Sequence, residues 1–218
     1  MTLTLYAHPF SSYCQKALIA LYENGTPFTL RTLDPEDPQA LAEHEALWPL
    51  RRMPVLVDDG RTVVEASIIV EHLGLYHPGP VRLVPEDGRA ALDVRMMDRF
   101  FDNYVMTPMQ KIVGDALRPA EARDAHGVAE AKRLLDAAYG WLDGAMKGRQ
   151  WAAGEFSLAD CAAAPALFYA DWTHPIADGF AAVRDYRRRL LARPSVARAV
   201  EEARPYRPLF PLGAPDRD

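Results

Sequence analysis

The residues best suited to chemistry form the run Ser11-Ser12-Tyr13-Cys14, near the start of a chain of 218 residues. This run follows an alternating apolar stretch and precedes residues with the spacing of one helix face. Its hydroxyls, its thiol and its backbone N–H groups are therefore expected at the positive end of a helix dipole. Such a position binds anions and lowers the pKa of a thiol. Serine is also a favoured helix N-cap, so the run alone is consistent with a purely structural role.

Two further segments could hold parts of a ligand. Pro54 suits the first residue of a strand because proline has no backbone N–H, and a cis bond would leave the backbone of Met53 free to pair with something extended. Glu65, Ala66 and Ser67 follow a hairpin and open another helix, which makes a polar N-terminus able to hold a carboxylate or accept an ammonium. Strand starts and helix caps explain both segments without a ligand.

The sequence lacks the residue patterns of several other kinds of functional site. A serine hydrolase fits poorly because His8 precedes Ser11 by three residues, but no Gly-x-Ser-x-Gly elbow exists. His72 and His77 are five residues apart and are expected to diverge on a helix, so the sequence predicts no metal site. No phosphate-binding loop is present in the sequence.

The first third of the chain alternates strand-like and helical segments, as an α/β domain requires. Asp58-Asp59-Gly60 marks a tight hairpin turn. The predicted order is βαβαββα, with a parallel βαβ unit first and an antiparallel pair last. Strands are expected at 2–6, 28–33, 55–57 and 62–64, and helices at 13–23, 38–47 and 66–76.

Beyond a linker rich in Pro and Gly, the sequence predicts helices only. Thr107-Pro108 should kink or interrupt the first of them, and Ser157 with Asp160 forms a capping box that we assign to folding. The chain thus divides into a domain at 1–77, a linker at 78–88 and an all-helical domain at 89–218. Helices are expected at about 87–117, 120–147, 157–172, 179–192 and 195–203, with an extended tail over 205–218.

Composition and charge exclude several partners. The net charge is −5, and residues 1–76 hold five Lys and Arg against ten Asp and Glu. A basic cluster at 184–193 is interpreted as a solvated helix face, so no nucleic acid is expected. The longest apolar run, 161–170, is about half of what spans a bilayer, and no signal peptide is recognised. Cys14 and Cys161 are expected to be reduced thiols in a cytoplasmic protein.

Taken together and in this order, the segments resemble the cytosolic glutathione transferases, and the resemblance covers about residues 1–205. It implies a thioredoxin-like first domain, a helical second domain, glutathione as co-substrate, a role in detoxification and a homodimer. The features are those of serine-type bacterial members, with some zeta-like and theta-like character. The resemblance is carried by residues 11–16, residues 52–60, Glu65 with Ile68, Ile69 and Leu73, and residues 156–160.

In serine-type members the first serine of this corner donates a hydrogen bond to the glutathione sulfur, which implies this role for Ser11. Lowering a thiol pKa of about 8.5 by about two units needs roughly 2.7 kcal/mol, which a charge-assisted hydrogen bond plus a helix dipole can supply. Ser12 is the rival donor, Tyr6 is an alternative, and Cys14 could assist or form mixed disulfides.

The resemblance also implies a set of glutathione contacts. Arg52 would meet the glycyl carboxylate, and the backbone of Met53 would bind the cysteinyl unit. The family's Glu-Ser pair reads Glu65-Ala66 here, so Ser67 or backbone N–H groups would have to replace the missing hydroxyl. The implied glutathione-binding residues are Arg52, Met53, Pro54 in cis, Glu65, Ala66 and Ser67.

The electrophile is expected between the domains, against the first long helix after the linker. A glutathione-dependent isomerase or dehalogenase remains open because both begin with the same thiolate. A binding or regulatory protein without turnover also remains open, and Ala66 is the feature that fits it. The expected pocket residues are Tyr104, Met106, Thr107 and Trp172, with Asn103 and Met109 as further candidates.

Overall fold

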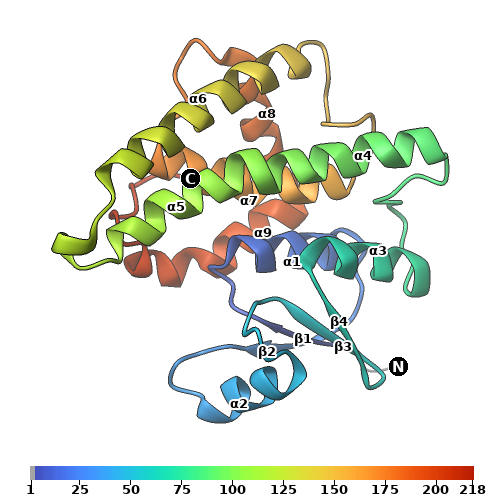
Figure 1. Ribbon diagram of the computed structural model, residues 1–218. Helices are drawn as coiled ribbons and strands as arrows, with labels where there is room; N and C mark the ends of the chain where they lie inside the picture. Colours follow the sequence, from blue (N-terminus) through green and yellow to red (C-terminus); the bar gives the residue numbers. More distant parts are fainter. Residues whose placement is uncertain (1–2) are drawn as a thin grey trace.

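A four-stranded sheet organises the first third of the chain. The computed structural model describes residues 3–218 (Figure 1). The strands lie in the order β2-β1-β3-β4; β1 pairs with β2 in parallel, and β1–β3 and β3–β4 are antiparallel. This confirms the predicted order of elements, although Thr2, where the first strand was expected to begin, lies outside the described residues. The strands are β1 Leu3–Ala7, β2 Thr29–Thr32, β3 Val55–Asp58 and β4 Arg61–Val64.

Three helices flank this sheet: α1 Ser12–Glu23, α2 Pro38–Leu47 and α3 Ala66–Tyr76. Figure 1 shows α1 and α3 on the face toward the helical domain and α2 on the other face. The Ser11 and Asp37 side chains cap α1 and α2 by accepting backbone N–H bonds.

Helix α1 lies between two hydrophobic cores. Leu18 and Leu21 pack into the core beneath the sheet, while Ile19 and Ala20 belong to the core of the helical domain. Because both faces of α1 are buried, its N-terminal end is held rigidly at the boundary of the two domains.

Helices alone make up the described part of the second domain, as predicted. No helix in residues 3–218 has the length and apolar character needed to cross a membrane. The segment expected as a helix at 120–147 begins with a short 3₁₀ turn and only then becomes α-helical. The helices are α4 Gly88–Phe100, α5 Thr107–Ala116, α6 Ala125–Met146, α7 Leu158–Thr173, α8 Ala181–Leu191 and α9 Pro194–Ala203, with 3₁₀ turns at Ala120–Ala122 and Arg204–Leu209.

The expected interruption at Thr107-Pro108 takes the form of a π-helical segment, η1, over Phe101–Met106. Proline lacks the N–H of a regular helix and its ring crowds the carbonyl one turn earlier, so the distortion falls before Pro108. The Thr107 N–H and hydroxyl both donate to the carbonyl of Asp102. This segment joins α4 to α5 and changes which side chains face the first domain.

The capping box at the start of α7 is confirmed. The backbone N–H of Ser157 donates to Asp160 at 2.9 Å, and Asp160 also accepts from the N–H of Ala152. The prediction of an extended tail over 205–218 was wrong in its first part, which is a 3₁₀ turn. Phe210 then packs edge-on against Trp172, and this apolar contact holds the turn against the helical core.

The interpretation of 184–193 as a wholly solvated face was also wrong. Arg184 and Arg188 are exposed, but Arg187 pairs with Asp171 at 3.5 Å and is largely buried. Arg193 pairs with Glu23 of α1, and its guanidinium lies 3.7 Å from the centre of the Phe156 ring. These inward arginines tie the helices to one another and to the first domain.

Candidate functional site

A polar cavity of about 570 Å³ opens where β1 ends and β3 begins. It collects side chains from both domains: the start of α1, the loop before β3, the start of α3, and the α4–η1–α5 helix. Its lining residues are Ser11, Tyr13, Trp48, Arg51, Arg52, Met53, Pro54, Glu65, Ala66, Arg99, Asp102, Asn103 and Gln110.

Ser11 faces this cavity as the N-cap of α1. Its Oγ accepts the backbone N–H of Cys14 at 3.4 Å, and its own N–H donates to the carbonyl of His8 at 2.9 Å. Because the cap uses the oxygen only as an acceptor, the hydroxyl proton can be donated to another group. A helix dipole and a hydroxyl donor thus act at one point of the cavity wall.

The two rivals of Ser11 do not line the polar cavity. Ser12 is a buried residue in the first turn of α1 and does not line the polar cavity. The Tyr6 hydroxyl donates to Glu43 at 3.2 Å, and burial together with this carboxylate raises the pKa of Tyr6. The Tyr6 hydroxyl is thus engaged by Glu43, whereas Ser12 lines an apolar cavity next to Ser11.

Cys14, which was expected to assist chemistry or to form mixed disulfides, does not line the polar cavity. Its side chain is fully buried against the sheet, and burial raises the pKa of the thiol to about 11 despite hydrogen bonds at the helix start. Desolvation of the thiolate therefore outweighs the hydrogen bonds that favour it. Cys14 is a packing residue.

The loop before β3 supplies both backbone and cationic groups. The Met53–Pro54 peptide bond is cis, and both residues line the cavity. Arg52 also lines it, and its carbonyl lies 3.0 Å from Nε2 of His44, which anchors the loop to α2. Arg51, which the sequence reasoning did not select, lines the same wall.

The start of α3 forms the opposite wall. Glu65 has φ of +71° and makes no side-chain cap, so the first N–H groups of α3 receive no cap from it. A non-glycine residue in this conformation costs on the order of 1–3 kcal/mol and is typical of functional sites. Glu65 and Ala66 line the cavity as expected.

Ser67 does not replace the missing hydroxyl at position 66. Its Oγ accepts from Lys16 Nζ at 2.8 Å and donates to Asp98 at 2.8 Å. The Nζ of Lys16, itself almost fully buried, also pairs with Asp98 and lies 3.0 Å from Asp102. Ser67 is therefore drawn into a buried charge cluster behind the cavity, which consists of Lys16, Ser67, Asp98, Arg99 and Asp102.

Several cavity residues were missed or only partly anticipated. Arg99 and Asp102 are one helical turn apart and join the charge cluster to the cavity. Asn103, a further candidate for the electrophile pocket, lies in the polar cavity instead. Burial and the nearby Asp102 raise the pKa of Tyr13 to about 12, so its phenol stays protonated and can donate a hydrogen bond. Tyr13 belongs to the run Ser11-Ser12-Tyr13-Cys14, but its phenol was not among the predicted site residues.

A second, apolar cavity of about 260 Å³ lies on the other side of Ser11. Met109 lines it as anticipated, and the tail closes it with Phe210. Ser11 and Gln110 each line both the polar and the apolar cavity. The apolar cavity is lined by Phe10, Ser11, Ser12, Met109, Gln110, Val113, Leu117, Tyr169, Leu209, Phe210 and Pro211.

None of the four residues expected in the electrophile pocket lines that cavity. Met106 is buried in the core, and the Thr107 hydroxyl bonds the carbonyl of Asp102. Trp172 lies behind Phe210, and Tyr104 faces a different groove between α4 and α6. The π-helical segment accounts for the placement of Tyr104 and Met106, because it rotates residues 101–106 relative to a regular helix. Thr107 and Trp172 lie outside this segment.

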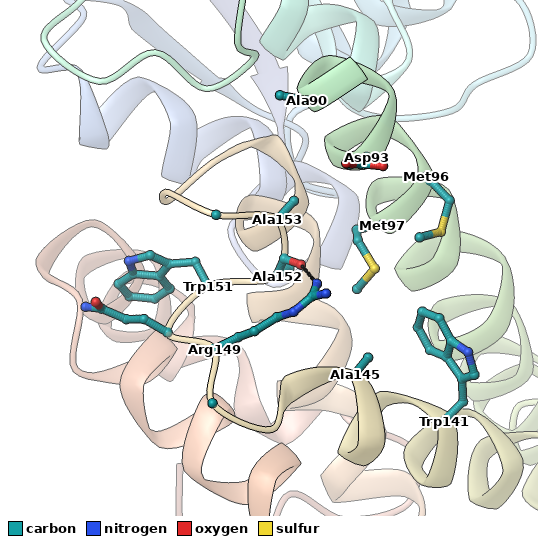
Figure 2. A pocket seen from close by; sticks show the side chains of 13 residues that line it. Ala90, Asp93, Met96, Met97, Trp141, Ala145, Arg149, Trp151, Ala152 and Ala153 are labelled. Carbon is teal, nitrogen blue, oxygen red and sulfur yellow. Dashed lines mark hydrogen bonds between the residues drawn. The ribbon is translucent and has the colours of Figure 1, made fainter. Parts of the chain in front are cut away.

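A larger cavity of about 670 Å³ lies between α4, α6 and the loop before α7 (Figure 2). Asp93 and Arg149 are its only charged lining residues, and the Arg149 guanidinium donates to the carbonyl of Ala152 at 3.4 Å. Met96 and Trp141 provide much of its wall. It lacks the helix N-termini and the cluster of polar groups that mark the cavity at Ser11.

The expectation that His72 and His77 diverge was wrong. The Nε2 atoms of both rings lie within 2.8 Å of one oxygen of Asp58. Helix α3 ends at Tyr76, so His77 does not continue the helical rotation that would carry it away. These three residues lie at the other end of the sheet from Ser11.

Two family models match the chain. The glutathione S-transferase N-terminal domain matches residues 5–81, and the glutathione S-transferase C-terminal domain matches residues 104–194. The matches cover both the sheet domain and most of the helical domain.

Curated relatives match at modest identity. A maize protein named glutathione transferase GST 23 is 30% identical over 108 residues, which are 48% of this chain and 44% of that protein. The chain thus spans under half the length of this relative. Mouse chloride intracellular channel protein 3 is 28% identical over 171 residues, covering 72% of this chain and 68% of that protein.

Solved structures are similar over nearly the whole chain. A glutathione S-transferase from Methylobacterium radiotolerans, in complex with glutathione sulfonate, has a TM-score of 0.78 and 30% identity, covering 92% of this chain and 95% of that one. One from Methylobacillus flagellatus with glutathione bound has a TM-score of 0.81 and 23% identity, covering 91% and 98%.

Proposed function

Because this chain belongs to the glutathione S-transferase family, we propose that it binds glutathione in the polar cavity and activates its thiol for attack on a small apolar electrophile. Ser11 donates a hydrogen bond to the sulfur and stabilises the thiolate, and the thiol proton leaves to solvent. The thiolate then forms a carbon–sulfur bond with the acceptor, which releases its leaving group or takes up a proton after addition.

The position of Ser11 carries this proposal. Its hydroxyl proton can be donated, its helix dipole favours negative charge, and it faces the polar cavity on one side and the apolar cavity on the other. A glutathione sulfur held there would contact the Ser11 hydroxyl and the electrophile at the same time. Positioning of this kind lowers the barrier of a bimolecular reaction.

The charges of the polar cavity complement glutathione. Three guanidinium groups and two carboxylates line it, whereas glutathione carries two carboxylates and one ammonium. In this proposal Arg52 meets the glycyl carboxylate and the backbone of Met53 pairs with the cysteinyl unit. Glu65 and Asp102 favour the ammonium, and the first N–H groups of α3 receive the neighbouring carboxylate.

The acceptor side favours small, uncharged molecules. Its cavity of about 260 Å³ is lined mainly by aromatic and aliphatic side chains. This volume is at the lower limit for a small-molecule site, so an acceptor of a few heavy atoms or a single ring fits best. A glutathione-dependent isomerase or dehalogenase begins with the same thiolate and stays within this proposal, as does a detoxifying role in the cytoplasm.

The decisive test is the ultraviolet absorbance of the glutathione thiolate, titrated with protein between about pH 5 and 9. We expect a saturable signal with a lowered thiol pKa in the native protein. Ser11→Ala should lose that signal near neutral pH while glutathione still binds, because a hydrogen bond to a charged group contributes about 1.5–3 kcal/mol. Ser12→Ala is the matched control and should keep the signal. An unchanged thiol pKa in Ser11→Ala would remove Ser11 from the mechanism.

The position of Ser67 favours one alternative of a different class. With its hydroxyl engaged by Lys16 and Asp98, and with Ala66 in the wall, the γ-glutamyl end has no serine to meet it. A folded protein without measurable glutathione affinity in calorimetry would support a binding or regulatory protein without turnover.

We also propose a homodimer that uses the groove between α4 and α6. This groove of about 510 Å³ is mainly apolar, and Tyr104, Leu134 and Trp141 are exposed along it. Exposed aromatic and aliphatic side chains gathered along one groove are typical of an interface. Sedimentation should give a dimer for the native protein and a monomer for Trp141→Glu; a native monomer at micromolar concentration would contradict the proposal.

A further inference from the structure

Three potential metal ligands converge at the end of the first domain remote from Ser11. The Nε2 atoms of His72 and His77 lie 2.7 and 2.8 Å from the same carboxylate oxygen of Asp58. All three ligand atoms lie within 4.8 Å of one another. The side chains are 7–13% exposed, so the cluster is largely enclosed but still open to a water molecule.

The fold, not the spacing in the sequence, creates this cluster. Five residues along a continuous helix turn a side chain by about 140°, which would separate the two imidazoles. Instead α3 ends at Tyr76, and His77 takes φ of −134° and ψ of 54° while its N–H still bonds the carbonyl of Leu73. This non-helical backbone conformation brings the second imidazole back toward the first.

Asp58 reaches the same point from the sheet. It is the last residue of β3, before the tight turn into β4, and it pairs with Leu3 of β1. Figure 1 places the β3–β4 turn on the same side of the domain as the end of α3. The three ligands therefore come from a strand end, a helix and a helix cap, all on rigid elements.

We propose that Asp58, His72 and His77 form a binding site for a divalent transition-metal ion, with Zn²⁺ as the ion that fits best. Two imidazole nitrogens and one carboxylate oxygen suit ions of intermediate softness such as Zn²⁺. Co²⁺ and Ni²⁺ can serve as probes of the same site. Three protein ligands leave one position of a tetrahedron for water. The charge of the ion is offset in part by Asp58.

The observed distances fit this site with small movements. Tetrahedral Zn²⁺ with bonds of about 2.0–2.1 Å holds neighbouring ligand atoms about 3.3 Å apart. The imidazoles would each move about 0.5 Å away from the carboxylate, and their two Nε2 atoms, which lie within 4.8 Å of each other, would move up to about 1.5 Å closer together. A neutral imidazole that carries its proton on Nε2 shifts it to Nδ1 when the metal binds, and a protonated imidazole releases one proton to solvent.

A metal here joins the end of α3 to the β3–β4 hairpin. At the other end of the same elements, β3 begins beside the cis Met53–Pro54 bond and α3 begins at the cavity. The site is thus expected to stabilise the scaffold of the glutathione cavity without contacting the ligand. It rests on its own contacts and does not depend on the role proposed for Ser11.

The test uses the full chain, stripped with a chelator and titrated with ZnCl₂ in calorimetry and by competition with a chromophoric chelator. We expect one ion per chain in the native protein. Co²⁺ should give the ligand-field absorption of a four-coordinate site. His77→Gln should weaken binding by at least about 100-fold, since loss even of an outer partner costs 10–100-fold. His126→Gln is the matched control, because His126 is exposed on α6, and should bind as the native protein does.

Thermal unfolding provides a second readout. At a free Zn²⁺ concentration about 100 times Kd, the Tm of the native protein should rise by about 5–10 °C. The Tm of His77→Gln should not respond, and Asp58→Asn should behave in the same way. Absence of stoichiometric binding in the native protein would overturn the proposal. So would binding that survives in His77→Gln and disappears in His126→Gln, because it would place the ion on the surface.

Discussion

The N-terminal ends of α1 and α3 are built from similar residues but use their serines in opposite ways. Each helix follows a strand at the edge of the polar cavity, and each has a serine at or next to its first turn. Ser11 caps α1 and keeps its hydroxyl proton available to the cavity. Ser67 turns away from the cavity and bonds the buried charges of Lys16 and Asp98.

The difference comes from the neighbours that tertiary packing supplies. Behind α3 lie a buried ammonium and two carboxylates, whose desolvation is offset only when hydrogen bonds surround them. A hydroxyl within reach is therefore recruited into the cluster. Ser11 has neutral neighbours instead: its hydroxyl accepts the backbone N–H of Cys14 and lies beside the Cys14 thiol. A serine near a helix start thus becomes a ligand donor or a structural bridge according to the charges nearby.

A variant that breaks the buried charge cluster behind α3 should lower stability the most. Lys16→Met leaves Asp98 and Asp102 buried with only the half-exposed Arg99 to offset them. We expect the free energy of unfolding to fall by about 3–5 kcal/mol and Tm by about 10 °C or more in thermal unfolding. Lys132→Met, on the exposed side of α6, should leave both unchanged. Equal Tm values for the two variants would contradict the cluster as described.

Removal of the bridging hydroxyl alone should have a smaller effect of the same kind. Ser67→Ala leaves Lys16 and Asp98 each without one partner, so we expect a loss of about 1–3 kcal/mol in denaturant unfolding. The Kd for glutathione, measured by calorimetry, should stay within about twofold. A large loss of glutathione affinity with unchanged stability would show that Ser67 faces the ligand after all.

A substitution can place a hydroxyl where α3 lacks one. Ala66 lines the cavity, so Ala66→Ser adds a donor at the expected γ-glutamyl end. One hydrogen bond contributes about 1 kcal/mol, so the Kd for glutathione should tighten about fivefold. Ala66→Val, which adds bulk without a donor, is the control and should weaken binding. Equal affinity for the Ser and Val variants would place the γ-glutamyl group elsewhere.

The smallest expected effect concerns Cys14, the thiol at the start of α1. With the pKa of this thiol raised to about 11, only about one molecule in a thousand carries the thiolate at pH 8. Stability and activity should therefore be unaffected by excess iodoacetamide under native conditions, and mass spectrometry should find Cys14 unlabelled. The labelling rate should increase as pH rises toward 11. Rapid native labelling at neutral pH would contradict the burial of Cys14.

Short sequence patterns predicted helix bounds and turns correctly where neighbouring residues alone determine the local structure. The bounds expected for the helices at 38–47 and 66–76 match α2 and α3, and the Asp59–Gly60 turn joins β3 to β4. Asp37 and Gly60 act through their immediate neighbours, so their effect can be read from short stretches of sequence. The positions of Ser11, Arg52, Met53, Pro54, Glu65 and Ala66 around one cavity follow from the same elements once their order is known.

Predictions that assumed a regular helix failed for physical reasons. The π-helical turn before Pro108 rotated residues 101–106, and the Tyr104 side chain came to face another groove. The end of α3 at Tyr76 allowed His72 and His77 to meet at Asp58, although their spacing on a helix separates them. In each case a change of helix geometry over a few residues redirected a side chain.

The sequence by itself determined the order of elements, the division into an α/β and a helical domain, and the placing of Ser11 at a helix start, because hydrophobic periodicity and capping act over a few residues. Only the tertiary structure decided that Cys14 is fully buried, that Ser67 serves a buried charge cluster, and that two histidines share one carboxylate. Burial and charge pairing depend on residues distant in the chain, such as Lys16 and Asp98 or Asp58 and His77, and no local pattern encodes the distance between them.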